Sequence, residues 1–87
     1  MPKRIIKQEV ANTLADNLFI LRKRKRVTLR GMAKHVSVTA QALNYYERGL
    51  RAPSLFVASE LAKYFGITLE DLFDDQLCFR VRTTRRI

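Results

Sequence analysis

Four neighbouring positions in the middle of the chain carry side chains suited to contacts with the edges of nucleic-acid bases. Gln41 and Asn44 each hold an amide that could pair with adenine N6 and N7. Tyr45 could contact a thymine methyl group or a phosphate, and Ala40 could meet a thymine methyl group. Because residues three and four apart share a helix face, a helix here would present these side chains together. The alternative is a solvated helix face or, for Tyr45, packing beside Tyr46.

The pattern around these positions predicts two short helices that cross at a tight turn, within residues 29–48. Apolar side chains recur at helical spacing on both sides of the turn, and the small Ala33 would let the helices approach closely. The residues expected to face inward are Met32, Ala33, Val36, Val38, Leu43 and Tyr46. Such a helix-turn-helix unit places its second helix in the major groove, so double-stranded DNA is the first partner to expect.

The charge of the chain is strongly positive and unevenly distributed. The 87 residues carry a net charge of +9, with an isoelectric point near 10.5. Nine basic residues and one acid, Glu47, lie between Arg22 and Arg51, whereas residues 54–75 hold five acids and one base, Lys63. A polyanion would be attracted to the basic part, with an affinity that falls as salt is added. A basic surface kept for solubility is the alternative.

Composition argues against several other classes of protein. The single cysteine, Cys78, rules out an internal disulfide, has no partner for a metal site, and fits a reducing cytoplasm, where a DNA-binding protein would associate with the nucleoid. No apolar run exceeds four residues, so neither a signal peptide nor a transmembrane helix is expected. One histidine, no phosphate-binding glycine loop and no clustered carboxylates give no support to an enzyme, a metal or a cofactor.

Apolar spacing and capping residues predict five helices in one domain over residues 1–75. The expected helices cover residues 6–25, residues 29–35 after Thr28, residues 40–47 between Thr39 and Gly49, a fourth helix from Pro53 and Ser54 to Gly66, and a short fifth helix from Thr68. Thr68 and Asp71 resemble a capping box. In the first, fourth and fifth helices the residues expected inward are Val10, Leu14, Leu18 and Leu21, then Leu55, Ala58, Leu61, Ala62 and Phe65, then Leu69, Leu72 and Phe73.

The tail, residues 76–87, breaks the helical rhythm. Leu77, Phe79 and Val81 alternate with Cys78 and arginines, which is the period of a half-buried strand. A lone strand needs a partner, so we expect it to pair across a homodimer axis, to join another protein's sheet, or to stay flexible. Phe73 in the fifth helix is the other candidate for a dimer contact.

Between Leu14 and Phe73 the chain resembles the Cro/cI-type helix-turn-helix family, also called the lambda-repressor-like or XRE family. The resemblance rests on several linked motifs: LRKRKRVTLRGMA before the turn, V-x-V-T in it, YERG closing the third helix, P-S before the fourth, and FGITLEDLF at the end. It implies an all-α, five-helix, lambda-repressor-like DNA-binding domain, followed here by the strand-like or flexible basic tail.

The resemblance also implies roles for individual positions. The residues matching those that face the major groove are Ala40, Gln41, Asn44 and Tyr45, and those near phosphates are Thr28, Lys34, Thr39, Arg48 and Arg51. Arg30, near the start of the second helix, is a further phosphate candidate. Residues matching Arg22 and Glu47 commonly form a partly buried ion pair in relatives. Two positions depart from the family. Many relatives have glycine where Ser37 stands, and a left-handed backbone there would strain serine; Gly31 costs about 1 kcal/mol relative to alanine inside a helix.

The sequence therefore predicts a sequence-specific transcriptional regulator, a repressor, that binds a palindromic operator as a homodimer through its third helix. One alternative is an antitoxin-type regulator whose tail binds a partner protein, which a co-purifying toxin-sized protein would favour. Another is a protein-interaction adaptor that uses the apolar tail and the basic face. Salt-insensitive binding to an acidic protein, without DNA affinity, would favour the adaptor.

Overall fold

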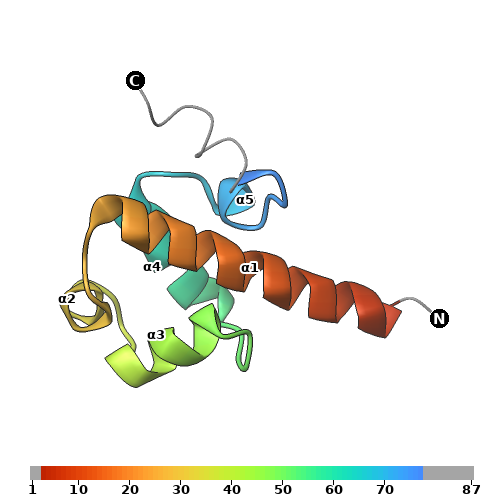
Figure 1. Cartoon of the computed structure of the whole chain (residues 1–87), viewed down its shortest axis with the longest axis horizontal. Helices are drawn as coiled ribbons and strands as arrows, with labels where there is room; N and C mark the ends of the chain where they lie inside the picture. Colours follow the sequence, from red (N-terminus) through yellow and green to blue (C-terminus); the bar gives the residue numbers. More distant parts are fainter. Residues whose placement is uncertain (1–2, 78–87) are drawn as a thin grey trace.

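The computed structural model describes the backbone of residues 3–77 and the side chains of residues 12–77. This part of the chain is all-helical, as predicted, with α1 Lys3–Lys25, α2 Leu29–Ala33, α3 Ala40–Glu47, α4 Leu55–Phe65 and α5 Leu69–Leu72. The helix α1 packs against α3 and α5, while α2 contacts α3 and α4 contacts α5. Figure 1 shows α1 crossing the molecule, with its first turns extending beyond the other helices.

The four shorter helices begin at side-chain caps, three of which (Thr28, Thr39 and Thr68) the sequence predicts, while α4 begins at Leu55 with Ser54 as its cap rather than at Pro53 and Ser54. The caps are Thr28, Thr39, Ser54 and Thr68, whose hydroxyl oxygens accept the backbone N–H of Gly31, Ala42, Val57 and Asp71, respectively. Thr68 and Asp71 complete a capping box, which confirms that prediction. Each cap satisfies an N–H that the helix itself leaves without a partner, so these residues fix where the helices start.

The second helix is two residues shorter than predicted. Lys34 and His35 donate their backbone N–H to carbonyls only three residues earlier, those of Gly31 and Met32, at 3.3 and 3.0 Å. This tighter bonding ends α2 at Ala33 and leads the chain into the turn before α3. The turn therefore spans more residues than the sequence pattern suggests.

The turn does not contain the backbone strain expected at Ser37. Among the described residues, positive φ values occur at Gly49, Gly66 and one non-glycine, Arg26, where φ is 62°. The two glycines follow α3 and α4, as predicted from the sequence. The strained position thus lies at the end of α1 rather than between α2 and α3.

One hydrophobic core draws on all five helices. It consists of Leu14, Leu18, Leu21, Met32, Leu43, Tyr46, Val57, Ala58, Leu61, Leu72 and Leu77. Ala33, Val36 and Val38 are half-buried against this cluster, which confirms the inward face predicted around the turn. Leu69 and Phe65 also pack against it, while the Val10 side chain lies outside the described residues.

The inward face of α4 differs from the predicted stripe at its first residue. The sequence places Leu55 in this stripe, but its side chain is 71% exposed. The buried residues are Val57, Ala58, Leu61 and Ala62. At about 100° per residue, Leu55 lies roughly 90° from the middle of this face and in the first turn of the helix. Phe56 beside it is 66% exposed.

The end of α5 also corrects two sequence predictions. Phe73, expected to be buried, is the C-cap of α5 and is 38% exposed, because Leu72 occupies the core instead. The chain then turns at Asp74, whose side chain accepts the Gln76 N–H at 2.8 Å. This turn returns Leu77 to the core, where it is 5% exposed. Leu77 thus closes this turn, with its N–H donating to the Asp74 carbonyl oxygen at 3.1 Å, rather than lying in an extended strand; its role in dimerisation stays a prediction.

The other two residues of the predicted strand, Phe79 and Val81, lie outside the described residues. Their expected role in dimerisation stays a prediction. The described chain up to residue 77 continues the helical domain beyond α5, since Leu77 packs in the same core as residues of α1 and α4.

A buried polar side chain, not anticipated from the sequence, connects α1 with α5. Asn17 is 1% exposed and lies between the core residues of α1. Its Nδ2 donates to the carbonyl oxygens of Leu72 and Asp74 at 2.8 and 2.9 Å. These carbonyls lie at the end of α5 and just after it, where a helix leaves backbone acceptors for partners outside the helix, and that of Asp74 also accepts the Leu77 N–H at 3.1 Å. Asn17 thus caps α5 from a neighbouring helix.

Candidate nucleic-acid interface

The third helix has a buried face and an outward face. Leu43 and Tyr46 lie in the core, at 0% and 7% exposure, and they fix how α3 is rotated. The outward residues are those predicted from the sequence: Gln41, which is exposed, and Ala40, Asn44 and Tyr45, which are half-buried. The structure therefore brings together one short polar surface of the size that enters a major groove.

Two of these outward side chains, Gln41 and Tyr45, are joined by a hydrogen bond. The Gln41 Nε2 donates to the Tyr45 hydroxyl at 2.9 Å. The guanidinium carbon of Arg51 lies 5.8 Å from the centre of the Tyr45 ring. Tyr45 thus lies over the outward face of α3, between an amide and a cation. A Gln41 held in this way keeps its carbonyl oxygen and one amide hydrogen for another partner.

Thr28 and Thr39 cap the N-termini of α2 and α3, where an anion such as a phosphate could bind. Thr28 Oγ1 accepts the Gly31 N–H at 2.9 Å, and Thr39 Oγ1 accepts the Ala42 N–H at 3.1 Å. A hydroxyl that accepts such a bond still carries a proton that it can donate to a phosphate oxygen. Both threonines are exposed, so their expected phosphate contacts are sterically open.

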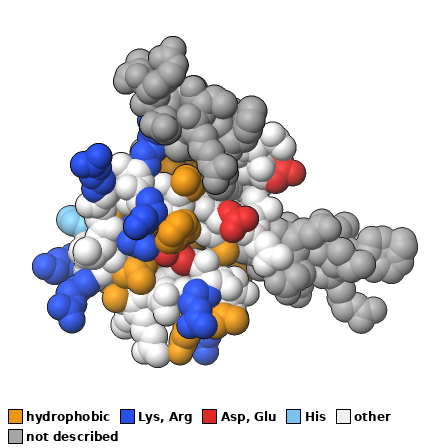
Figure 2. Space-filling view, in the orientation of Figure 1, with side chains coloured by type: hydrophobic (Ala, Val, Ile, Leu, Met, Phe, Trp, Pro, Cys, Tyr) orange, Lys and Arg blue, Asp and Glu red, His pale blue; other side chains and the backbone are white. Residues whose placement is uncertain are grey.

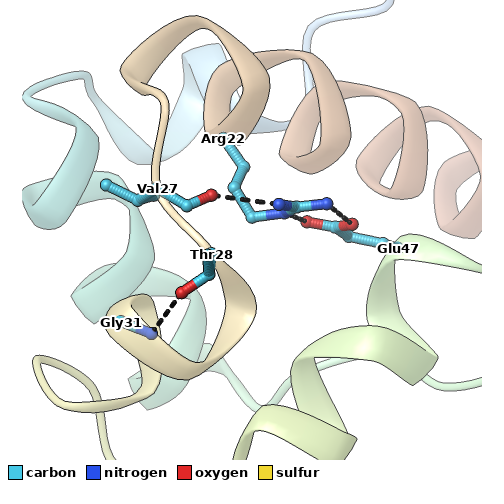
Figure 3. A network of polar contacts seen from close by, with 5 residues as sticks. All are labelled: Arg22, Val27, Thr28, Gly31 and Glu47. Carbon is cyan, nitrogen blue, oxygen red and sulfur yellow. Dashed lines mark hydrogen bonds and ion pairs between the residues drawn. The ribbon is translucent and has the colours of Figure 1, made fainter.

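One guanidinium fixes α3 to the rest of the domain. Arg22 Nε lies 2.7 Å from Glu47 Oε2, and its Nη2 donates to Oε1 at 3.2 Å. Its Nη1 donates to the Val27 carbonyl oxygen at 3.0 Å (Figure 3). The Arg22 and Glu47 side chains are only 15% and 5% exposed. The ion pair implied by the family resemblance is therefore present, and it joins α1, the segment before α2, and the end of α3.

The cations expected to contact phosphates are all exposed. Arg30 and Lys34 are exposed on and after α2, and Arg48 and Arg51 are exposed after α3. Figure 2 shows Lys and Arg side chains along the edge of the molecule formed by α2 and over the region of α3. A flexible exposed cation binds a phosphate without reading sequence, so these residues would set affinity and register.

The structure adds contacts from α4 that the sequence analysis missed. Glu60 accepts the backbone N–H of Ser37 at 2.9 Å and its hydroxyl at 2.7 Å. Tyr64, one helical turn later, stacks on His35 with ring centroids 5.4 Å apart. The signal was a glutamate and a tyrosine at i and i+4, three and seven residues after the buried Val57, at the border of the apolar stripe of α4, where Tyr64 also packs against the core. Their partners lie in the turn, so they could not be identified by spacing alone.

Metal ligands do not gather in the described part of the chain, where no three His, Cys, Asp or Glu side chains could share an ion. Nor does any of the described helices combine the length and the apolar character needed to cross a membrane. The polar groups that do converge are those on α2, α3 and the segments leading into them.

This arrangement of two short capped helices around a turn, with a polar outward face, defines a helix-turn-helix protein. Comparison with known families agrees: the helix-turn-helix family matches residues 18–72, more than half of the chain. The chain belongs to this family, in its Cro/cI-like XRE branch. A protein of Methanocaldococcus jannaschii, described as an uncharacterized HTH-type transcriptional regulator, is 38% identical over 47 residues, which are 54% of this chain and 71% of the relative. No solved structure gives a significant match.

Proposed function

We propose that this protein is a sequence-specific DNA-binding transcriptional regulator, a repressor, that reads a two-fold symmetric operator as a homodimer. The family and the relative support a DNA-binding regulator of transcription. The observation that carries sequence-specific reading is the outward face of α3, where Gln41, Asn44 and Tyr45 stand opposite the buried Leu43 and Tyr46.

In the proposed complex, α3 lies in the major groove and its amides contact base edges. Gln41 and Asn44 can each bond adenine N6 and N7, and each such bidentate contact contributes about 1–3 kcal/mol of discrimination. Thr28 and Thr39 donate hydroxyl hydrogen bonds to DNA phosphates on either side of the groove. Phosphates are also bound there by the cationic side chains of Arg30, Lys34, Arg48 and Arg51. The Arg22–Glu47 pair is scaffold in this mechanism, since its side chains are almost buried.

Selection of binding sites from random duplex DNA tests this function. The purified chain and the variant Gln41→Ala/Asn44→Ala would be compared at about 150 mM salt, with thermal unfolding to establish that both are folded. We expect the wild type to enrich a palindrome and the variant to lose it while keeping salt-sensitive general binding. A matched control is Gln76→Ala, an exposed amide after α5 and outside the proposed interface. Enrichment of the same site by the double variant would contradict reading by α3.

The proposed dimer would place two α3 helices about 34 Å apart, one turn of DNA. Exposed apolar side chains support a protein contact: Phe73 is 38% exposed, and Leu55 and Phe56 at the start of α4 are 71% and 66% exposed. Sedimentation would measure the oligomeric state of Phe73→Ser, of Phe56→Ser and of a chain ending at Leu77. The variant that becomes a monomer identifies which of the two apolar surfaces, or the tail, forms the dimer contact. A deletion from residue 77, by contrast, would remove core packing and confuse dimerisation with folding.

Repression is tested by placing the selected site over the promoter of a reporter gene. A dimer bound there would exclude polymerase, so expression should fall when the wild type is supplied and recover with the Gln41→Ala/Asn44→Ala variant. Increased expression would instead indicate an activator that uses the same interface.

A further inference from the structure

Arg26 adopts a backbone conformation that glycine normally occupies. It follows α1 directly, with φ of 62°, and is the one non-glycine with positive φ among the described residues. At the corresponding places after α3 and α4 the chain uses Gly49 and Gly66, with φ of 73° and 72°. For an L-residue this conformation brings Cβ close to the following carbonyl oxygen, a strain that glycine avoids.

Ending α1 does not require an arginine side chain. The Arg26 backbone N–H donates to the carbonyl oxygens of Arg22 and Lys23 at 2.9 and 3.2 Å, and the Val27 N–H donates to the Arg22 carbonyl oxygen at 3.4 Å. Glycine at position 26 would make the same backbone bonds without the strain. The side chain itself is exposed and lies outside the core. A strained residue whose side chain the fold does not use points to a functional role for that side chain.

The position of Arg26 indicates what that role is. It lies two residues before Thr28, whose hydroxyl caps α2 and faces solvent. The intervening residue, Val27, has its carbonyl oxygen bonded by Arg22, and the same guanidinium holds Glu47 of α3 (Figure 3). The left-handed turn is therefore fixed relative to the recognition helix, and Arg26 projects from it.

We propose that Arg26 binds a DNA phosphate next to the start of α2, in addition to the cations on α2 and after α3. This inference rests on the proposed function. The left-handed turn fixes the backbone of Arg26 beside Thr28, so that a guanidinium and a hydroxyl can meet the DNA backbone at neighbouring positions. An arginine offers several donors in a planar arrangement that suits phosphate oxygens.

The test compares four proteins in binding to a labelled random-sequence duplex between about 50 and 200 mM salt, together with thermal unfolding. They are the wild type, Arg26→Gly, Arg26→Lys and the control Lys63→Gln, which removes one exposed charge from the last turn of α4. One phosphate contact contributes about 0.9 to the slope of log affinity against log salt. We expect Arg26→Gly to lower the slope by about this amount while its thermal midpoint stays equal or rises, and the other two variants to keep the wild-type slope.

Two outcomes would contradict the phosphate contact of Arg26 without contradicting the proposed function. One is a salt slope for Arg26→Gly equal to that of Lys63→Gln, which would leave only a general effect of net charge. The other is a lower thermal midpoint for Arg26→Gly, which would show that the arginine is kept for the fold. If the wild type binds no duplex at all, the proposed function fails together with the contact. Failure of the contact alone leaves wild-type binding intact, so the two failures are distinguishable.

Discussion

Glu60 on α4 holds the turn of the helix-turn-helix unit through Ser37. One carboxylate oxygen accepts the Ser37 backbone N–H and the other accepts its hydroxyl. Since Ser37 lies two residues before Thr39, the cap of α3, this pair of bonds fixes the direction in which the chain enters α3. The turn thereby has a defined shape without the left-handed backbone that a glycine would supply.

Removal of either partner should loosen this turn. We expect Glu60→Ala and Ser37→Ala each to destabilise the protein by about 1 kcal/mol, because the bonds are exposed and only one partner carries charge. Urea unfolding of both single variants and the double variant forms a cycle, in which the double variant should cost clearly less than the sum of the two. Strict additivity would show that the two residues act independently. Weaker operator binding by both single variants is expected, since α3 loses a fixed entry.

The Arg22–Glu47 pair should contribute to stability as well as to DNA binding. We expect Glu47→Ala to cost about 3 kcal/mol, because it leaves an almost buried guanidinium bonded to the Val27 carbonyl oxygen but without its carboxylate. Glu47→Gln keeps an acceptor for Arg22 and should cost less. Urea unfolding measures both values, and operator binding should follow the same order. A Glu47→Ala protein as stable as the wild type would contradict this role.

Asn17 should be nearly irreplaceable, because its amide supplies donors to two carbonyl oxygens at the end of α5. Asn17→Ala is expected to cost about 2 kcal/mol, because the buried Leu72 carbonyl oxygen loses the bond from Asn17, while that of Asp74 keeps the bond from the Leu77 N–H at 3.1 Å. Asn17→Asp has the same shape but no amide donor, so it should destabilise at least as much at neutral pH. Urea unfolding compares the two variants. An Asn17→Asp protein as stable as the wild type would show that shape, rather than donation, matters at this site.

The local signals in this sequence were sufficient for most of the secondary structure. Thr28, Thr39, Ser54 and Thr68 have hydroxyl groups that bond backbone groups three residues away, so their effect is encoded within one helical turn. The inward rotation of α3 was equally predictable, because Leu43 and Tyr46 lie three residues apart.

Contacts between distant segments were not predictable from such signals. Periodicity alone could not distinguish Leu55 from Val57 as the inward residue of α4, since either fits an apolar stripe. Alternation after α5 suggested a strand, but the turn at Asp74 brings Leu77 into the core. The bonds from Asn17 to Leu72 and from Ser37 to Glu60 join residues far apart in sequence, which only the packing of the helices determines.

The bond between Gln41 and Tyr45 should prepare α3 for reading bases. With its Nε2 bonded to the Tyr45 hydroxyl, Gln41 loses less side-chain freedom on binding, and ordering such a side chain costs about 0.5–1.5 kcal/mol. We therefore expect Tyr45→Phe to weaken binding to the selected operator by this amount and to leave binding to random duplex unchanged, as measured by fluorescence anisotropy. Stability should change by less than about 0.5 kcal/mol, since the bond is exposed. Tyr64→Phe removes a hydroxyl outside the interface and serves as the control. Tighter operator binding by Tyr45→Phe would mean that the Tyr45 hydroxyl competes with DNA for the Gln41 amide.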